Sequence, residues 1–138
     1  MKTKELIVDA AVEQLGKVNG FVQTLLEGME CSMKTQMQLD LAVEEIFVNI
    51  ASYAYGEGQG TVTVRGTVTE EPPGVELTFM DEGTPYNPLK REDPDMTIPM
   101  EDRGIGGLGI FLVKKNVDDI RYEYREGKNI LVLRKKLA

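Results

Sequence analysis

Asp81 is the first residue whose position suggests chemistry. It ends a run in which apolar residues alternate with more polar ones, the pattern of a half-buried strand. The apolar members are Val75, Leu77 and Phe79. A carboxylate at a strand end accepts a hydrogen bond from an exocyclic amine such as that of adenine, whereas guanine would offer it another acceptor. We therefore expect Asp81 to select the base.

A glycine cluster opens an apolar segment of helical character that closes on Lys114 and Lys115. Backbone N–H groups in the first turn of a helix have no intrahelical partner and suit phosphate oxygens, and glycine keeps the approach clear. The cluster consists of Gly104, Gly106, Gly107 and Gly109. Its spacing also matches the dinucleotide fingerprint, but that motif directly follows a strand, whereas here the sequence Pro99-Met-Glu-Asp-Arg precedes it. The context favours a phosphate-binding helix start over a Rossmann unit.

The segment 84–103 lies between Asp81 and the glycines and has the composition of a loop. It carries four of the six prolines and five acidic residues against three basic ones, which disfavours a helix or a strand. A structureless stretch of this length in a compact domain is usually a functional loop such as a lid, or disordered. Because the expected base and phosphate sites bracket it, we expect a lid over about residues 84–103.

The composition excludes several classes of site. The 138 residues fit one domain, 1–138, and the net charge of −7 argues against a direct nucleic-acid or anionic-membrane surface. Because the chain has one cysteine, Cys31, and no histidine, disulfide frameworks, cysteine zinc sites and histidine-assisted nucleophiles are excluded. No run is apolar and long enough to span a bilayer. We expect a cytoplasmic protein.

Apolar periodicity predicts the elements that must position these groups. Helical spacing predicts helices from Val12 to about Gly28, from about Met33 to Tyr55, and from about Gly107 to Val117, the last mostly buried. Alternation and short apolar runs predict strands over 4–8, 61–69, 75–81, 119–125 and 130–136, with turns at 70–74 and 126–129. Antiparallel hairpins with the helices on one face form an α+β fold, a two-layer α/β sandwich.

Two acidic residues and an amide lie together on the second predicted helix. Glu45 and Asn49 are spaced i, i+4, so their side chains lie one above the other beside the apolar face. Glu44 lies about a third of the way round the helix from Glu45. Taken alone, such glutamates are more often solvated surface residues. A carboxylate pair of Glu44 and Glu45 is disfavoured because neighbouring helix positions diverge.

Three separated motifs resemble, in order, the N box, G1 box and G2 box of the GHKL (Bergerat-fold) ATPases. They are Glu45-Ile-Phe-Val-Asn49, Asp81-Glu-Gly83 and Gly104-Ile-Gly-Gly-Leu-Gly109. The length, the compact lid and the near end-to-end match over residues 4–136 most resemble the bacterial anti-sigma-factor serine kinases. The resemblance implies a Bergerat ATP-binding fold with a mixed, mostly antiparallel sheet, and ATP and Mg²⁺ as cofactors.

The resemblance assigns roles to the matching positions. Asn49 would coordinate Mg²⁺ through its side-chain oxygen. Asp81 would bind the adenine amine, and Gly83 would let the backbone approach the base. Glu45 would be the general base that takes the proton of a partner's serine hydroxyl, or it would orient water in a hydrolase.

The phosphates are expected at the glycine-rich segment. Their contacts would be the N–H groups of Gly106, Gly107, Leu108 and Gly109, with Gly104 opening the same segment. Arg103 would meet the γ-phosphate or is a surface arginine. Tyr53 and Tyr55 would contact the nucleotide or pack against the domain, and packing is favoured.

Two functions follow from the resemblance. In the first, an ATP-dependent serine kinase phosphorylates an anti-sigma-factor antagonist and sequesters a sigma factor in the alternative state, which makes it a bacterial regulator of transcription. In the second, a catalytically inactive module uses ATP only to order residues 84–103 and so switches partner binding. The resemblance also implies a homodimer through the N-terminal strand and first helix.

Overall fold

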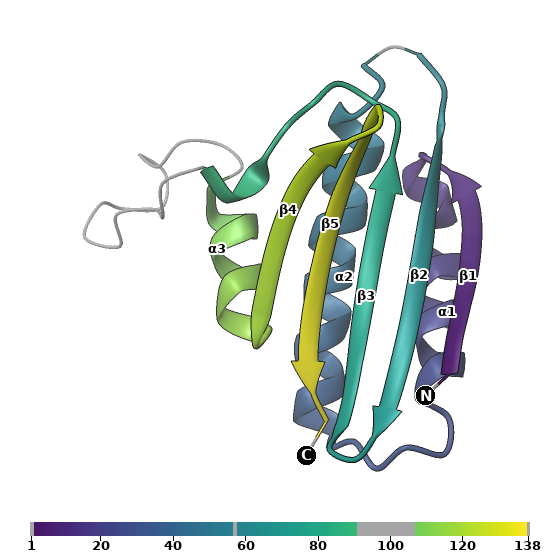
Figure 1. Ribbon diagram of the computed structural model, residues 1–138, viewed down its shortest axis with the longest axis vertical. Helices are drawn as coiled ribbons and strands as arrows, with labels where there is room; N and C mark the ends of the chain where they lie inside the picture. The colour runs from purple at the N-terminus through teal and green to yellow at the C-terminus, as the bar shows by residue number, and fades with distance from the viewer. Residues whose placement is uncertain (1, 57, 91–106, 138) are drawn as a thin grey trace.

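The computed structural model describes residues 2–56, 58–90 and 107–137, which form one sheet with helices against one face (Figure 1). The strands are β1 (Lys2–Asp9), β2 (Thr61–Glu70), β3 (Pro73–Asp81), β4 (Asp119–Arg125) and β5 (Lys128–Lys136). The α-helices are α1 (Leu15–Leu26), α2 (Met33–Tyr53) and α3 (Gly107–Asn116), and the 3₁₀ turns are η1 (Val12–Gln14) and η2 (Pro88–Lys90). The predicted order of strands and helices and the α+β sandwich are confirmed.

The sheet has the order β1-β2-β3-β5-β4, and each neighbouring pair in the described part of the chain is antiparallel. The expectation of a mixed sheet is therefore corrected to an antiparallel one. The reason is the place of β5. The chain crosses from β3 through α3 to β4, which runs parallel to β3, but β5 lies between these two strands and is antiparallel to both.

The strict alternation of β2 gives the sheet one apolar face and one polar face. Val62, Val64 and Val68 are buried against the helices, and the threonines of the strand lie on the other face. Gly66 belongs to the apolar face, where a Cβ would lie 2.1 Å from Cδ1 of Leu25. This glycine therefore allows α1 to pack close to the sheet.

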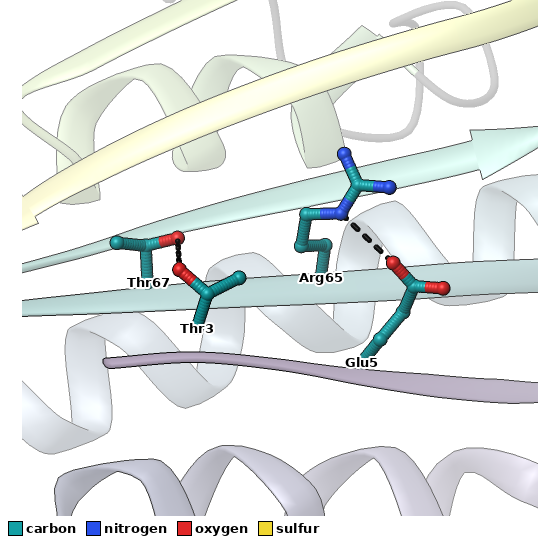
Figure 2. A network of polar contacts seen from close by, with 4 residues as sticks. All are labelled: Thr3, Glu5, Arg65 and Thr67. Carbon is teal, nitrogen blue, oxygen red and sulfur yellow. Dashed lines mark hydrogen bonds and ion pairs between the residues drawn. The ribbon is translucent and has the colours of Figure 1, made fainter. Parts of the chain in front are cut away.

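Polar pairs join β1 to β2 on the face that points away from the helices. The hydroxyls of Thr3 and Thr67 lie 3.0 Å apart, and Nε of Arg65 donates to Oε2 of Glu5 over 2.9 Å (Figure 2). Both members of the ion pair are about half exposed, so it contributes well under ~1 kcal/mol. The attachment of β1 depends mainly on its backbone ladder and on core residues such as Val8.

The helix ends differ from the predicted ones for local reasons. The first helix begins with η1 and ends at Leu26, two residues before Gly28, whose φ is +81°. The second helix ends at Tyr53 instead of Tyr55: Ala54 is its C-cap, and Gly56 follows with a φ of +58°, which a helix cannot continue. The free carbonyl groups of Ala54 and Tyr55 accept hydrogen bonds from the N–H groups of Thr84 and Gly58. Glu45 and Asn49 stay within the second helix, whereas Tyr55 lies just beyond its end.

The third helix is less buried than predicted. Ile110 and Val113 are buried, but Leu112 is 43% exposed. The helix lies beside β4 at one end of the helical layer (Figure 1). Among the described residues, its main packing partner is α2. No helix in the described residues is long and apolar enough to cross a membrane.

Candidate functional site

A cavity of about 340 Å³ lies between α2 and the end of the sheet at which β3 finishes. Its size falls in the range of small-molecule sites. Its lining includes Asn49 and Asp81 together with Ile46, Ile50, Tyr53, Ala54, Phe79, Thr84, Pro85, Tyr86, Pro88, Ile110, Tyr122, Asn129 and Leu131. The cavity therefore brings two of the three predicted motifs to one place.

Asp81 enters this cavity as a fixed carboxylate. The residue is 5% exposed, and its Oδ1 accepts hydrogen bonds from the backbone N–H of Gly83 and from Nδ2 of Asn129, both over 2.9 Å. Among the described residues, none donates to Oδ2. Because both donors bind Oδ1, Oδ2 is left to accept a hydrogen bond from a ligand.

Asn129 lines the cavity but belongs to none of the sequence motifs. It was expected in a turn over 126–129, but the turn contains only Glu126 and Gly127, both with positive φ, and β5 begins at Lys128. The register then pairs Asn129 with Asp81. The only sequence signal was an amide directly before the apolar run that begins at Ile130, and its partner cannot be identified without the register.

Two tyrosines near the cavity donate hydrogen bonds within the chain. The Tyr122 hydroxyl donates to Oδ1 of Asn129, and the Tyr55 hydroxyl donates to the carbonyl of Thr61 over 2.7 Å. Burial raises the pKa of both phenols above the ordinary value, so both remain protonated donors at neutral pH. The Tyr55 hydroxyl also accepts from the N–H of Glu82 over 2.8 Å.

The prediction that both tyrosines at the end of α2 pack is half right. Tyr55 packs as expected, and a Cβ on Gly60 would lie 2.2 Å from its ring. Tyr53 instead lines the cavity and is 66% exposed. The two residues diverge because side chains two positions apart near the end of a helix point to nearly opposite sides.

Glu45 lies one turn before Asn49 and faces the first turn of α3. A Cβ built on Gly109 would lie 2.4 Å from its Oε2, so the carboxylate occupies the space that this glycine leaves open. Glu45 is half-buried, whereas Glu44 is exposed. The geometry agrees with the expectation that Glu44 and Glu45 do not act as a pair.

Gly83 has a packing role that was not predicted. A Cβ there would lie 2.1 Å from the carbonyl oxygen of Ala54, and the N–H of Thr84 donates to the same oxygen over 2.7 Å. Because the obstacle is backbone, a side chain at 83 would displace the end of α2. The approach of this backbone to a base stays a prediction.

The glycine-rich segment is described only in part. Gly107, Leu108 and Gly109 form the first turn of α3, as predicted, and the next residue, Ile110, lines the cavity. Arg103, Gly104 and Gly106 lie outside the described residues, as does the expected lid beyond Lys90. The phosphate contacts therefore stay predictions, although the helix start that would make them lies beside the cavity.

In the described residues there is no group of three or more histidine, cysteine, aspartate or glutamate side chains that could hold a metal ion. The amide oxygen of Asn49 is the hard ligand that the cavity wall offers from α2. This donor suits Mg²⁺, which takes few protein ligands and fills its remaining positions with phosphate oxygens and water.

Comparison with known proteins finds a family model, described as the histidine kinase-like ATPase domain, that matches residues 8–135. The serine-protein kinase RsbW of Listeria monocytogenes is 31% identical over 99 residues, which are 68% of this chain and 62% of that protein. The serine/threonine-protein kinase BtrW of Bordetella bronchiseptica is 30% identical over 105 residues, 74% of this chain and 71% of that protein. The chain thus spans about 62% of the length of the Listeria monocytogenes RsbW relatives that it matches.

Solved structures share the fold at lower identity. The RsbU and RsbW domains of a Mycobacterium tuberculosis protein superpose with a TM-score of 0.69 at 14% identity, covering 99% of this chain and 33% of that one. The histidine kinase domain of a blue-light activated histidine kinase from Erythrobacter litoralis superposes with a TM-score of 0.55 at 15% identity, covering 91% of this chain and 60% of that one. At these identities the likeness supports the architecture.

Proposed function

The chain belongs to the histidine kinase-like ATPase domain family, and from this premise we propose that it binds ATP in the cavity beside α2 and phosphorylates a serine hydroxyl of a partner protein. One observation carries the proposal. Asn49 and Asp81, which come from different motifs, line the same cavity, and Glu45 lies one turn from Asn49 against the start of α3.

The base would be recognised by Asp81. Its Oδ1 is held by two internal donors, so Oδ2 is the oxygen that accepts a hydrogen bond from the 6-amino group of adenine. Guanine carries a carbonyl at this position and would place one acceptor against another. The apolar side chains of Ile50, Ala54 and Leu131 supply the surface against which the ring packs.

The phosphates would lie toward Asn49 and the start of α3. The N–H groups of Gly107, Leu108 and Gly109 are in the first turn, where backbone donors have no intrahelical partner. Asn49 would contribute one oxygen to Mg²⁺, which neutralises phosphate charge when bound.

Glu45 would act as the general base. Its carboxylate takes the proton of the serine hydroxyl as that oxygen forms a bond to the γ-phosphorus, while the bond from this phosphorus to the β–γ bridging oxygen breaks. The products are phosphoserine and ADP. The glycine at 109 keeps the space for this carboxylate open.

The acceptor is proposed to be an anti-sigma-factor antagonist, with a sigma factor bound in the alternative state. Support comes from two relatives whose names identify them as serine or serine/threonine kinases and from the motif resemblance. These partners would place the protein in the cytoplasm.

Isothermal titration with ATP and with GTP, each with and without Mg²⁺, tests the nucleotide site. We expect ATP to bind more tightly than GTP, Asp81→Asn to remove this preference, and Asn49→Ala to remove the effect of Mg²⁺. A wild-type protein that binds no nucleotide would contradict the proposal.

Transfer of radiolabelled phosphate from γ-labelled ATP to a purified antagonist then separates a kinase from an inactive module. Glu45→Gln should abolish transfer and preserve ATP binding. A wild-type protein that binds ATP but labels no antagonist would favour the regulatory module.

A further inference from the structure

The side-chain amide of Asn129 is hydrogen-bonded within the chain at both of its ends. The residue is 7% exposed. Its Nδ2 donates to Oδ1 of Asp81 over 2.9 Å and to the carbonyl of Thr84 over 3.0 Å. Its Oδ1 accepts from the N–H of Tyr86 over 3.1 Å and from the hydroxyl of Tyr122. The amide orientation is thereby fixed, because each end faces groups of the matching kind.

These bonds leave Asn129 little to offer a ligand. Both hydrogens of Nδ2 and both lone pairs of Oδ1 have partners within the chain. Any effect of Asn129 on a bound nucleotide must therefore pass through the groups that it holds. One of these groups, the carboxylate of Asp81, is the proposed receptor of the base amine.

We propose that Asn129 is a positioning residue that sets the base specificity of the cavity by holding the Asp81 carboxylate. This inference rests on the proposed function, because it takes the ligand to be an adenine nucleotide. With two donors on Oδ1, rotation of the carboxylate breaks two hydrogen bonds, and Oδ2 stays directed at the base amine. Without Asn129 only the Gly83 N–H remains, and the carboxylate can turn.

Asn129 also ties the carboxylate to the cavity wall. The carbonyl of Thr84 and the N–H of Tyr86 are both bound to the same amide, and both residues line the cavity. One side chain therefore fixes the position of the acceptor for the amine and the backbone that faces the base. This set of hydrogen bonds needs an amide side chain, which donates at one end and accepts at the other.

The test compares two nucleotides in the full chain. ATP carries the 6-amino group, and purine riboside 5′-triphosphate lacks it but has the same phosphates. For the wild type we expect calorimetry to give ATP binding at least tenfold tighter than the analogue. In Asn129→Asp, which keeps the acceptor for Tyr86 and Tyr122 but places a second carboxylate against Asp81, ATP affinity should fall at least tenfold.

The ratio of the affinity for ATP to the affinity for the analogue distinguishes a positioning role of Asn129 from a general effect on the stability of the fold. Asn129→Asp should change the affinity for the analogue less than threefold, so the ratio falls toward one. Asn87→Asp is the matched control, because it adds the same charge nearby while its Oδ1 still accepts from the N–H of Leu89. There the added charge repels both triphosphates equally, and the ratio should stay at the wild-type value.

The outcomes separate the two proposals. If the wild type binds neither triphosphate, the proposed function fails and the inference fails with it. If the wild type discriminates and Asn129→Asp keeps the same ratio, the inference alone is overturned. Should this variant not fold by circular dichroism, Tyr122→Phe removes one bond that orients the amide, and its ratio should fall at least twofold. An unchanged ratio in Tyr122→Phe would then overturn the inference.

Discussion

At the scale of single residues, the site depends on two glycines whose lack of a side chain leaves room for neighbouring groups. Gly109 leaves the space that the Glu45 carboxylate occupies, and Gly83 leaves the space for the carbonyl of Ala54. In the first case the neighbour is the end of a flexible side chain, and in the second it is backbone. A substitution should therefore impair catalysis at 109 and folding at 83.

Gly109→Ala should slow phosphotransfer roughly a hundredfold, the usual contribution of a general base, because the new Cβ displaces the Glu45 carboxylate. The affinity for ATP should change less than threefold, since the backbone N–H at 109 is retained. Single-turnover transfer rates and titration calorimetry measure the two effects.

Gly20→Ala in α1 is the control, because a Cβ there has nothing within 4 Å. It should leave transfer unchanged. Wild-type transfer by Gly109→Ala would show that Glu45 acts from another position.

At the scale of elements, α2 is the structural base of the site. It carries Glu45 and Asn49 on one stripe, and Ala54 directly after it accepts the hydrogen bond of Thr84. Its first turn is fixed by Ser32, whose Oγ accepts from the N–H of Thr35 over 3.1 Å. The helix is thus held at the end far from the cavity by its cap and at the near end by the loop after β3.

Ser32→Ala should lower the free energy of unfolding by about 1 kcal/mol, the usual loss when a helix cap is removed. Urea denaturation monitored by circular dichroism measures the change. Ser52→Ala, an exposed position near the end of the same helix, should cost nothing or stabilise slightly because alanine favours helix. Equal losses of unfolding free energy in Ser32→Ala and Ser52→Ala would contradict the capping role of Ser32.

At the scale of the whole molecule, the cavity is formed jointly by the helical layer and the sheet. Ile46 and Ile110 come from α2 and α3, whereas Phe79, Tyr122 and Leu131 come from three strands. A ligand bound here contacts both layers and binds the folded state alone. Binding should therefore raise the stability of the whole domain.

ATP with Mg²⁺ at a hundred times its dissociation constant should stabilise the fold by about 2.7 kcal/mol. For a domain of this size the midpoint of thermal unfolding should rise by about 9 °C. Differential scanning calorimetry measures the shift, which EDTA should reduce by removing Mg²⁺. GTP at the same concentration should give a smaller shift, and Asp81→Asn should lose most of the ATP effect. Equal shifts with ATP and GTP would contradict base recognition by Asp81.

The sequence alone determined the elements and much of the site. Alternation in β2 and helical spacing in α2 are local patterns with periods of 2 and 3.6, and they predicted the right elements to within a few residues. The positions of Asn49 and Asp81 on the cavity wall follow from a helix stripe and a strand end, which are local features too.

Only the tertiary structure decided how these parts meet. The placement of β5 between β3 and β4 is a matter of strand order, and the pairing of Asn129 with Asp81 depends on both that order and the register of the two strands. No local period encodes which strands become neighbours. The contacts of Gly109 with Glu45 and of Gly83 with Ala54 likewise join residues far apart in the chain. Periodicity specifies which face of an element is buried, whereas the partner on that face is set by packing across the whole domain.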